Sequence, residues 1–156
     1  MKSVAACLCS LTALIFLSCG MTGAKADFAA GAKAYDGGDY AKAYSEWKEA
    51  AQSGDLAAMV ALADLYRRGA GRSPNIDLAL HWYKQAAKAG DAIAQINLAE
   101  MYLNGWGTLR NLPLAWVWFN RAAKQGNAWA MSQRQILERV LSPSALATAK
   151  KMRNIR

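Results

Sequence analysis

A repeat of 36 residues is the feature that most constrains what this chain can fold into. Three segments align without a gap, and each has an aromatic residue at its second position, two consecutive alanines and a closing glycine: 46–54, 82–90 and 118–126. Alanines keep the same step at positions 43, 79 and 115 and at positions 58, 94 and 130. A unit of this length is too small to bury its own apolar face, so neighbouring units must stack on one another. The repeat therefore predicts a solenoid.

Each unit is predicted to contain two helices. Residues 56–68 hold apolar side chains at helical spacing, with no Gly or Pro between them. Glycines and a proline within 69–74 end that helix, and residues 76–89 resume the helical pattern up to Gly90. Gly69-x-Gly71 and its counterpart at 105–107 are therefore expected to be helix-stop turns and not phosphate-binding loops. We expect an all-α fold of about eight helices in four antiparallel pairs, without a sheet.

The repeat register also divides the chain into segments. After residue 130 the repeat pattern weakens, and Ser142 is the expected cap of a last helix over 144–153. A more polar final unit closes the open end of a solenoid. The expected segments are a targeting segment, a helix pair with a short loop, two full repeats and a degenerate half-repeat with a capping helix: 1–26, 27–54, 55–90, 91–126 and 127–156.

The recurring residues resemble those of a known repeat family. The pattern is Ala58, Leu62, Ala63, Tyr66, Gly69 and Gly71, followed by Ala79, Trp82, Tyr83, Ala86, Ala87 and Gly90. It resembles the Sel1-like repeat, a relative of the tetratricopeptide repeat, over most of residues 40–140. Residues 27–43 resemble the first half-unit of exported bacterial members. The resemblance implies that the first helix of each pair lines a concave surface, and that the protein scaffolds a complex or restrains an envelope sensor.

The first 26 residues are predicted to direct export. Lys2 precedes an apolar stretch from Val4 to Leu17, which is too short to span a bilayer, and Ala24 and Ala26 provide the small residues of a signal-peptidase site. Cleavage after Ala26 would give a periplasmic protein. The alternative is a lipoprotein anchored through Cys19, although Phe16 stands where a lipobox usually has leucine. All three cysteines precede Asp27, so the mature chain would have no thiol.

No residue pattern indicates an enzyme. His81 is the only histidine, so one chain cannot assemble a histidine-based zinc site. No serine lies in a nucleophile elbow. Asp64 and Glu100 are equivalent residues one repeat apart, and a solvated face explains them better than an acid–base pair does. A cysteine-rich branch of the family is linked to β-lactam binding or hydrolysis, but this chain has no cysteine pair in its repeats. We expect no catalysis, no cofactor and no metal.

Charge is distributed unevenly along the chain. Residues 27–106 hold 8 basic and 10 acidic side chains, a net charge of −2, whereas residues 107–156 hold 9 basic side chains against Glu138 alone, a net charge of +8. The basic excess either complements helix C-termini or meets an acidic partner, and both interpretations stay open. Nucleic acid would fit the charge but not an exported chain.

The binding face is predicted by elimination, from positions on the first helices that packing does not fix. These are Asp64, Arg67, Arg68, Asn97, Glu100, Leu103, Asn104, Trp129, Gln133 and Arg139. Trp129 stands out because its equivalents are Ala57 and Ile93; it either anchors a partner or packs under the terminal helix. Trp106 is a second candidate. We hypothesise a monomeric, non-catalytic periplasmic protein that binds another envelope protein, with a carbohydrate- or peptidoglycan-binding protein or hydrolase as the alternative.

Overall fold

The computed structural model describes residues 28–152, which form eight helices and no strand. The helices are α1 (Phe28–Asp36), α2 (Tyr40–Gln52), α3 (Leu56–Arg68), α4 (Ile76–Lys88), α5 (Ala92–Asn104), α6 (Leu112–Lys124), α7 (Ala128–Val140) and α8 (Pro143–Met152). The predicted signal segment and Cys19 lie outside the described residues. None of the eight described helices is both long and apolar enough to cross a bilayer.

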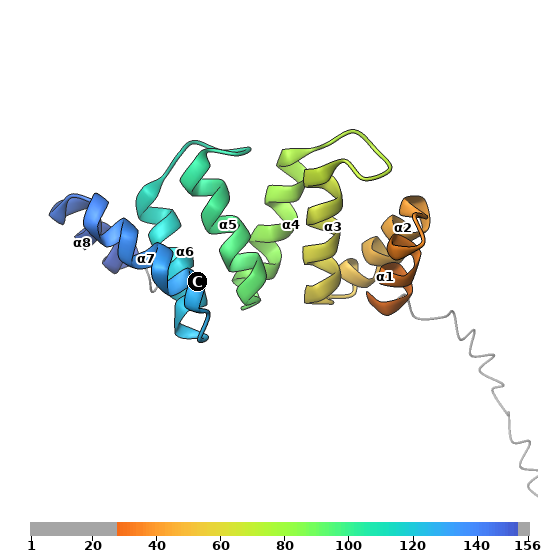
Figure 1. The fold of residues 1–156 in the computed structure, drawn as a ribbon, viewed down its shortest axis with the longest axis horizontal. Helices are drawn as coiled ribbons and strands as arrows, with labels where there is room; N and C mark the ends of the chain where they lie inside the picture. Colours follow the sequence, from red (N-terminus) through yellow and green to blue (C-terminus); the bar gives the residue numbers. More distant parts are fainter. Residues whose placement is uncertain (1–27, 153–156) are drawn as a thin grey trace, which may run out of the picture.

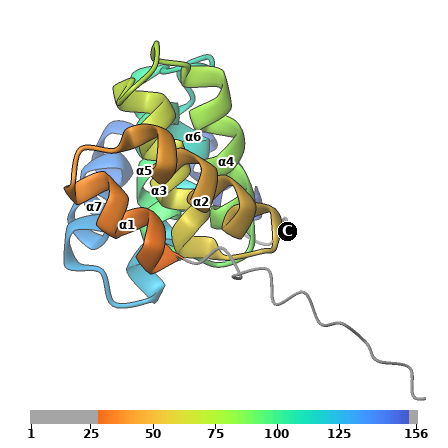
Figure 2. The same ribbon diagram turned by 90° about the vertical axis from the view of Figure 1, so that its right-hand side faces the viewer.

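The helices stack into an elongated solenoid, as predicted (Figure 1). From α1 to α7, each helix packs against the next one along the chain. In the view along the stack, α1, α5 and α7 lie on one side, while α4 and α6 lie on the other (Figure 2). We call the surface formed by α1, α3, α5 and α7 the inner face, and the surface formed by α2, α4, α6 and α8 the outer face.

The core consists of repeating alanines with larger side chains between them. Six alanines at the 36-residue step are fully buried: Ala43, Ala58, Ala79, Ala94, Ala115 and Ala130. A methyl group at a helix crossing lets two backbones approach closely, and larger side chains fill the space beside the crossing. Trp47, Tyr83 and Phe119 do so on the second helices, and all three are buried.

Polar caps set where most of the helices begin. A side-chain oxygen accepts a hydrogen bond from the backbone N–H three residues later at six helix starts: Asp39, Asp55, Asn75, Asp91, Asn111 and Asn127. Each cap satisfies one N–H that the helix itself cannot bond. The Ser142 hydroxyl does the same for Ala145 at 3.2 Å, which confirms the predicted cap of the last helix.

The paired glycines have two different roles. Gly69 ends α3 in the left-handed conformation, as expected of a helix-stop residue. Gly71 also has a positive φ, and a Cβ placed on it would lie 2.6 Å from the Cβ of Tyr40. A Cβ placed on Gly107 would likewise lie 2.7 Å from the Cγ2 atom of Ile76. The second glycine therefore lets each long loop lie against the start of the preceding second helix.

The C-terminal end of the solenoid differs from the fourth antiparallel helix pair that the sequence predicted. α8 packs against α6, and not along α7. Leu141 leaves α7 in an extended conformation and Pro143 starts α8 two residues later, so the chain turns away from α7. Ala149 of α8 is fully buried. Three helix pairs are thus followed by a single helix and a capping helix.

Replacing Gly71 with alanine tests the close approach of the loop. Gly54 is the matched control, because its φ is also positive but a Cβ there meets nothing within 4 Å. Gly54→Ala should lower the free energy of unfolding by about 1–2 kcal/mol from backbone strain alone. Gly71→Ala should lower it by about 1–3 kcal/mol more, because the start of α2 must shift. Urea unfolding of both variants measures the difference, and equal losses would contradict this role for Gly71.

Candidate functional site

The inner face carries two adjoining hollows over α3. One, of about 290 Å³, is lined by Phe28, Ala57, Val60, Ala61, Asp64, Asp91 and Ile93. The other, of about 220 Å³, is lined by Phe28, Tyr35, Trp47, Ala61, Asp64 and Arg68. They share Phe28, Ala61 and Asp64, so together they form one shallow trough. Its floor is made of small side chains of α3, with Phe28 and Ile93 at its borders.

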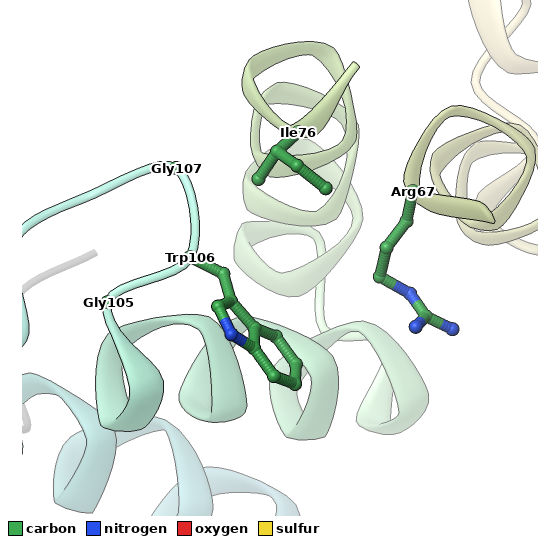
Figure 3. Close-up of a pocket in the computed structure, with 5 residues that line it drawn as sticks. All are labelled: Arg67, Ile76, Gly105, Trp106 and Gly107. Carbon is green, nitrogen blue, oxygen red and sulfur yellow. The ribbon is translucent and has the colours of Figure 1, made fainter. Parts of the chain in front are cut away.

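A larger hollow, the Trp106 pocket, lies where two repeats meet. Its volume is about 410 Å³, and its lining comes from α3, the start of α4 and the loop after α5: Arg67, Ile76, Gly105, Trp106 and Gly107. The Trp106 indole and the Arg67 side chain extend into the same space from opposite sides (Figure 3). Trp106 is 47% exposed although it is a large aromatic residue. Positive φ angles at Gly105 and Gly107 make the turn that presents it.

Arg67 is held in place by a polar cluster behind the pocket. Its Nη2 atom donates a hydrogen bond to Oδ1 of Asp64 at 2.8 Å, and its Nε atom donates to the Tyr83 hydroxyl at 3.4 Å. The Tyr83 hydroxyl in turn donates to the same oxygen of Asp64 at 2.8 Å. Tyr83 is fully buried, whereas the side chains of Asp64 and Arg67 are each about one-third exposed.

The electrostatics of this cluster keep Arg67 charged and Tyr83 protonated. Burial raises the pKa of the Tyr83 hydroxyl, and the negative charge of Asp64 raises it further. Burial alone would lower the pKa of the Arg67 guanidinium, but its bonds to Asp64 and Tyr83 raise it overall. The cluster therefore presents a fixed cation to the Trp106 pocket over the whole neutral pH range.

Glu100, the equivalent of Asp64 in the next repeat, has different surroundings. Phe119 stands there in place of Tyr83 and Leu103 in place of Arg67, so no hydroxyl or guanidinium is available at those positions. Among the described residues, no hydrogen bond to the Glu100 carboxylate is found. Burial raises the pKa of Glu100, and the charge of Arg67 lowers it in part. Both acids are half-buried, so the solvated face predicted for them is only partly open to water.

The other predicted residues do not form one site. Trp129 is 44% exposed and packs edge-on against Phe119, with ring centroids 5.4 Å apart, so it belongs partly to the α6–α7 contact. Asn104 donates a hydrogen bond to a carbonyl of its own helix. Arg68 adds a longer ion pair to Asp64, with 3.9 Å between Nε and Oδ1, and lines the smaller hollow of the trough. The remaining positions are exposed or half-buried, and no hydrogen bond or ion pair joins them among the described residues: Asn97, Leu103, Gln133 and Arg139.

Sequence reasoning missed most of the apolar lining. Phe28 and Ile76 are not among the predicted positions, because Ile76 starts a second helix and the predicted positions all lie on α3, α5 and α7, not on α1. Ile93 was recognised only as an equivalent of Trp129. Ile93 is 60% exposed. The signal that could have revealed it is a large apolar side chain at a position where the preceding repeat has alanine.

Fold and repeats together define the class of protein as an α-solenoid built from helix pairs. The chain belongs to the Sel1 repeat family: the Sel1 repeat model matches residues 56–91 and 92–127. Sel1 repeats typically mediate protein–protein interactions and generally serve as non-catalytic scaffolds. Among residues 28–152, no group of three or more His, Cys, Asp or Glu side chains is placed to hold a metal ion.

Two solved structures illustrate the similarity. A Sel1 repeat protein from Oxalobacter formigenes is 30% identical with a TM-score of 0.64, and the match covers 69% of this chain and 84% of that one. The protein c5321, a protective antigen present in uropathogenic Escherichia coli strains and displaying an SLR fold, is 29% identical with a TM-score of 0.75 over 79% of this chain. This chain spans only 27% of c5321. No curated protein matches this chain.

Replacing Glu100 with glutamine should stabilise the protein at neutral pH. Because the folded state raises the pKa of Glu100, it holds the proton more tightly than the unfolded chain does, and stability falls as the pH rises above about 4. Glu100→Gln removes this loss, so its free energy of unfolding should exceed that of the wild type at pH 7. The gain is small, since the side chain is half-exposed, and it should vanish below about pH 4.

Asp64→Asn provides the contrast in the same urea experiment. It weakens the pair with Arg67 and the bond from Tyr83, so it should destabilise the protein at pH 7. Destabilisation by both variants at pH 7 would contradict the assignment of Glu100 as a half-buried acid without a hydrogen-bond partner.

Proposed function

We propose that the protein is a non-catalytic adaptor or regulator of the periplasm that binds a partner protein through its inner face. The observation that carries the proposal is the Trp106 pocket, in which an exposed indole faces a fixed guanidinium across a repeat boundary. Trp and Arg are the residues most often found at the energetic centre of protein interfaces. An indole offers a large contact area at a small cost in conformational entropy.

Arg67 is suited to bind a polar group of the partner. A guanidinium has five N–H donors, and the two bonds to Asp64 and Tyr83 use donors on Nε and Nη2. These bonds fix the orientation of the group, so little further ordering is needed when a carbonyl or carboxylate binds. A partner side chain that packs on Trp106 and Ile76 would bring such an oxygen within reach.

The trough over α3 extends the proposed contact surface. Its lining of small and aliphatic side chains, such as Ala57, Ala61 and Ile93, suits apolar side chains of the partner. Arg67 and Asp64 lie one helical turn apart on α3, so the cluster that orients Arg67 also borders the trough. One partner segment could therefore contact both hollows.

Carbohydrate binding is the second candidate, and Trp106 is the observation that favours it. A half-exposed indole beside a guanidinium in an open hollow is also a suitable surface for a sugar ring with an acidic group. The envelope glycan peptidoglycan is the substrate class that this alternative implies. The two candidates differ in what Trp106 would contact.

Photo-crosslinking distinguishes the candidates. A benzophenone amino acid replaces Trp106 in one variant and Leu109 in the matched control; Leu109 belongs to the same loop, is 88% exposed and does not line the pocket. Irradiation of living cells should attach one protein in stoichiometric amount at position 106 and not at 109. Trp106→Ala should lower the affinity for that protein by about tenfold or more. Capture of glycan fragments alone at position 106 would instead support the second candidate.

The proposed location is tested at the N-terminus of the chain. The short apolar stretch and the Ala24-Lys25-Ala26 motif are its support. Mass spectrometry of the protein purified from the envelope should find Asp27 as the first residue. A lipidated Cys19 would place the protein on a membrane, and an uncleaved Met1 in the cytoplasm would overturn the proposed location.

A further inference from the structure

A separate hollow lies between α5, α6 and α8, with the end of α4 at its edge. Its volume is about 230 Å³, and its lining comprises Lys88, Tyr102, Leu114, Val117, Trp118, Arg121 and Met152. Trp118 and Val117 are buried, so the apolar floor is recessed below the surface. Arg121 lies over the Trp118 ring at 4.5 Å from its centroid. We call this hollow the α6–α8 groove.

The repeat provides an internal comparison for this groove. Three lining residues, which we call the framework of the groove, are the same one repeat earlier: Tyr66, Leu78 and Trp82 correspond to Tyr102, Leu114 and Trp118. The two cations differ, because Gln52 and Gln85 occupy the positions of Lys88 and Arg121. The same three framework residues are thus accompanied by neutral side chains in the preceding repeat and by two cations around the α6–α8 groove.

In the preceding repeat, the place equivalent to the groove is filled by the chain's own side chains. The hydroxyl groups of Tyr44 and Tyr66 lie 3.0 Å apart, and the guanidinium of Arg72 lies 3.4 Å from the centroid of the Tyr44 ring. In the next repeat, Leu80 and Thr108 replace Tyr44 and Arg72. The second tyrosine and the arginine that cover Tyr66 are thus missing at Tyr102. Lys84 lies over the Tyr102 ring, 5.9 Å from its centroid, and a hollow remains beside Tyr102.

Charge indicates what the groove accepts. Neither α6 nor α8 contains an Asp or Glu, whereas they carry Arg121, Lys124, Lys150 and Lys151, and Lys88 of α4 stands at the edge. Cations around an apolar floor complement an anion that carries an apolar group. The volume lies below the range of about 300–1,000 Å³ typical of small-molecule sites, so it suits a single side chain.

We propose that the α6–α8 groove binds an acidic segment of a partner protein, with one aliphatic or aromatic side chain seated on Trp118 and flanking carboxylates paired with Lys88 and Arg121. The recessed floor favours a peptide over a membrane surface, since insertion into a bilayer requires apolar side chains that protrude. This site shares no lining residue with the Trp106 pocket or with the trough over α3. The inference is therefore independent of the proposed inner-face function, and each can fail without the other.

A synthetic peptide tests the groove directly. The probe is a fluorescein-labelled peptide in which one leucine is flanked on both sides by glutamates, and its anisotropy reports binding to the purified chain. The test variant is Lys88→Gln with Arg121→Gln, which introduces the residues that the preceding repeat already has. The control is Lys33→Gln with Lys42→Gln, which removes the same charge from exposed positions of α1 and α2. Thermal unfolding followed by circular dichroism checks that both variants fold.

The expected result is saturable binding that the test variant weakens by about tenfold and the control leaves within about twofold. Replacing the leucine with serine should weaken binding comparably, and Trp106→Ala should leave it unchanged. Three outcomes would overturn the inference: no saturable binding of the peptide, equal losses in the test and control variants, or equal affinity for the serine peptide. Tighter binding to vesicles of anionic phospholipid, lost in the test variant, would assign the groove to a membrane and equally overturn it.

Discussion

The rest of the structure depends on the packing of one large aromatic side chain beside buried alanines in each of the first three helix pairs. Trp47, Tyr83 and Phe119 are buried on the second helices of the first three helix pairs. Trp47 and Tyr83 bond to the first helix of their own pair, at Phe28 and Asp64, whereas Phe119 packs against Trp129 of α7. The alanines bring the helices together, and each aromatic residue fills the volume that this close approach leaves. Because the same step of 36 residues governs both sets, one solution to the packing problem is reused along the chain.

Differences between equivalent positions are more informative about function than the shared residues are. Tyr83 anchors Arg67 and Asp64, whereas Phe119 lacks a hydroxyl and contacts Trp129 instead. Gln52 and Gln85 become Lys88 and Arg121 around the α6–α8 groove. Each exchange keeps the packing and changes the chemistry of the surface. A repeat protein thus separates the residues that build the fold from those that can specify a partner.

Sequence predicted the fold well and the site only in part. Helix number, the all-α class and the Ser142 cap followed from local patterns, because periodicity and capping depend on residues close together in the chain. The list of free positions on first helices included Arg67 and Asp64, but it could not reveal that they bind each other and Tyr83. It assigned Trp129 a leading role, whereas Trp106 lines the larger hollow.

The sequence by itself determined the repeat unit, the helix positions, the alanines at the crossings and the uneven charge. Only the tertiary structure decided that Trp106 and Arg67 line one pocket across a repeat boundary, and that α8 packs on α6 and borders the groove beside Trp118. The physical reason is that these contacts join residues of different units. Their geometry follows from how successive helix pairs rotate against one another, and no local pattern encodes that rotation.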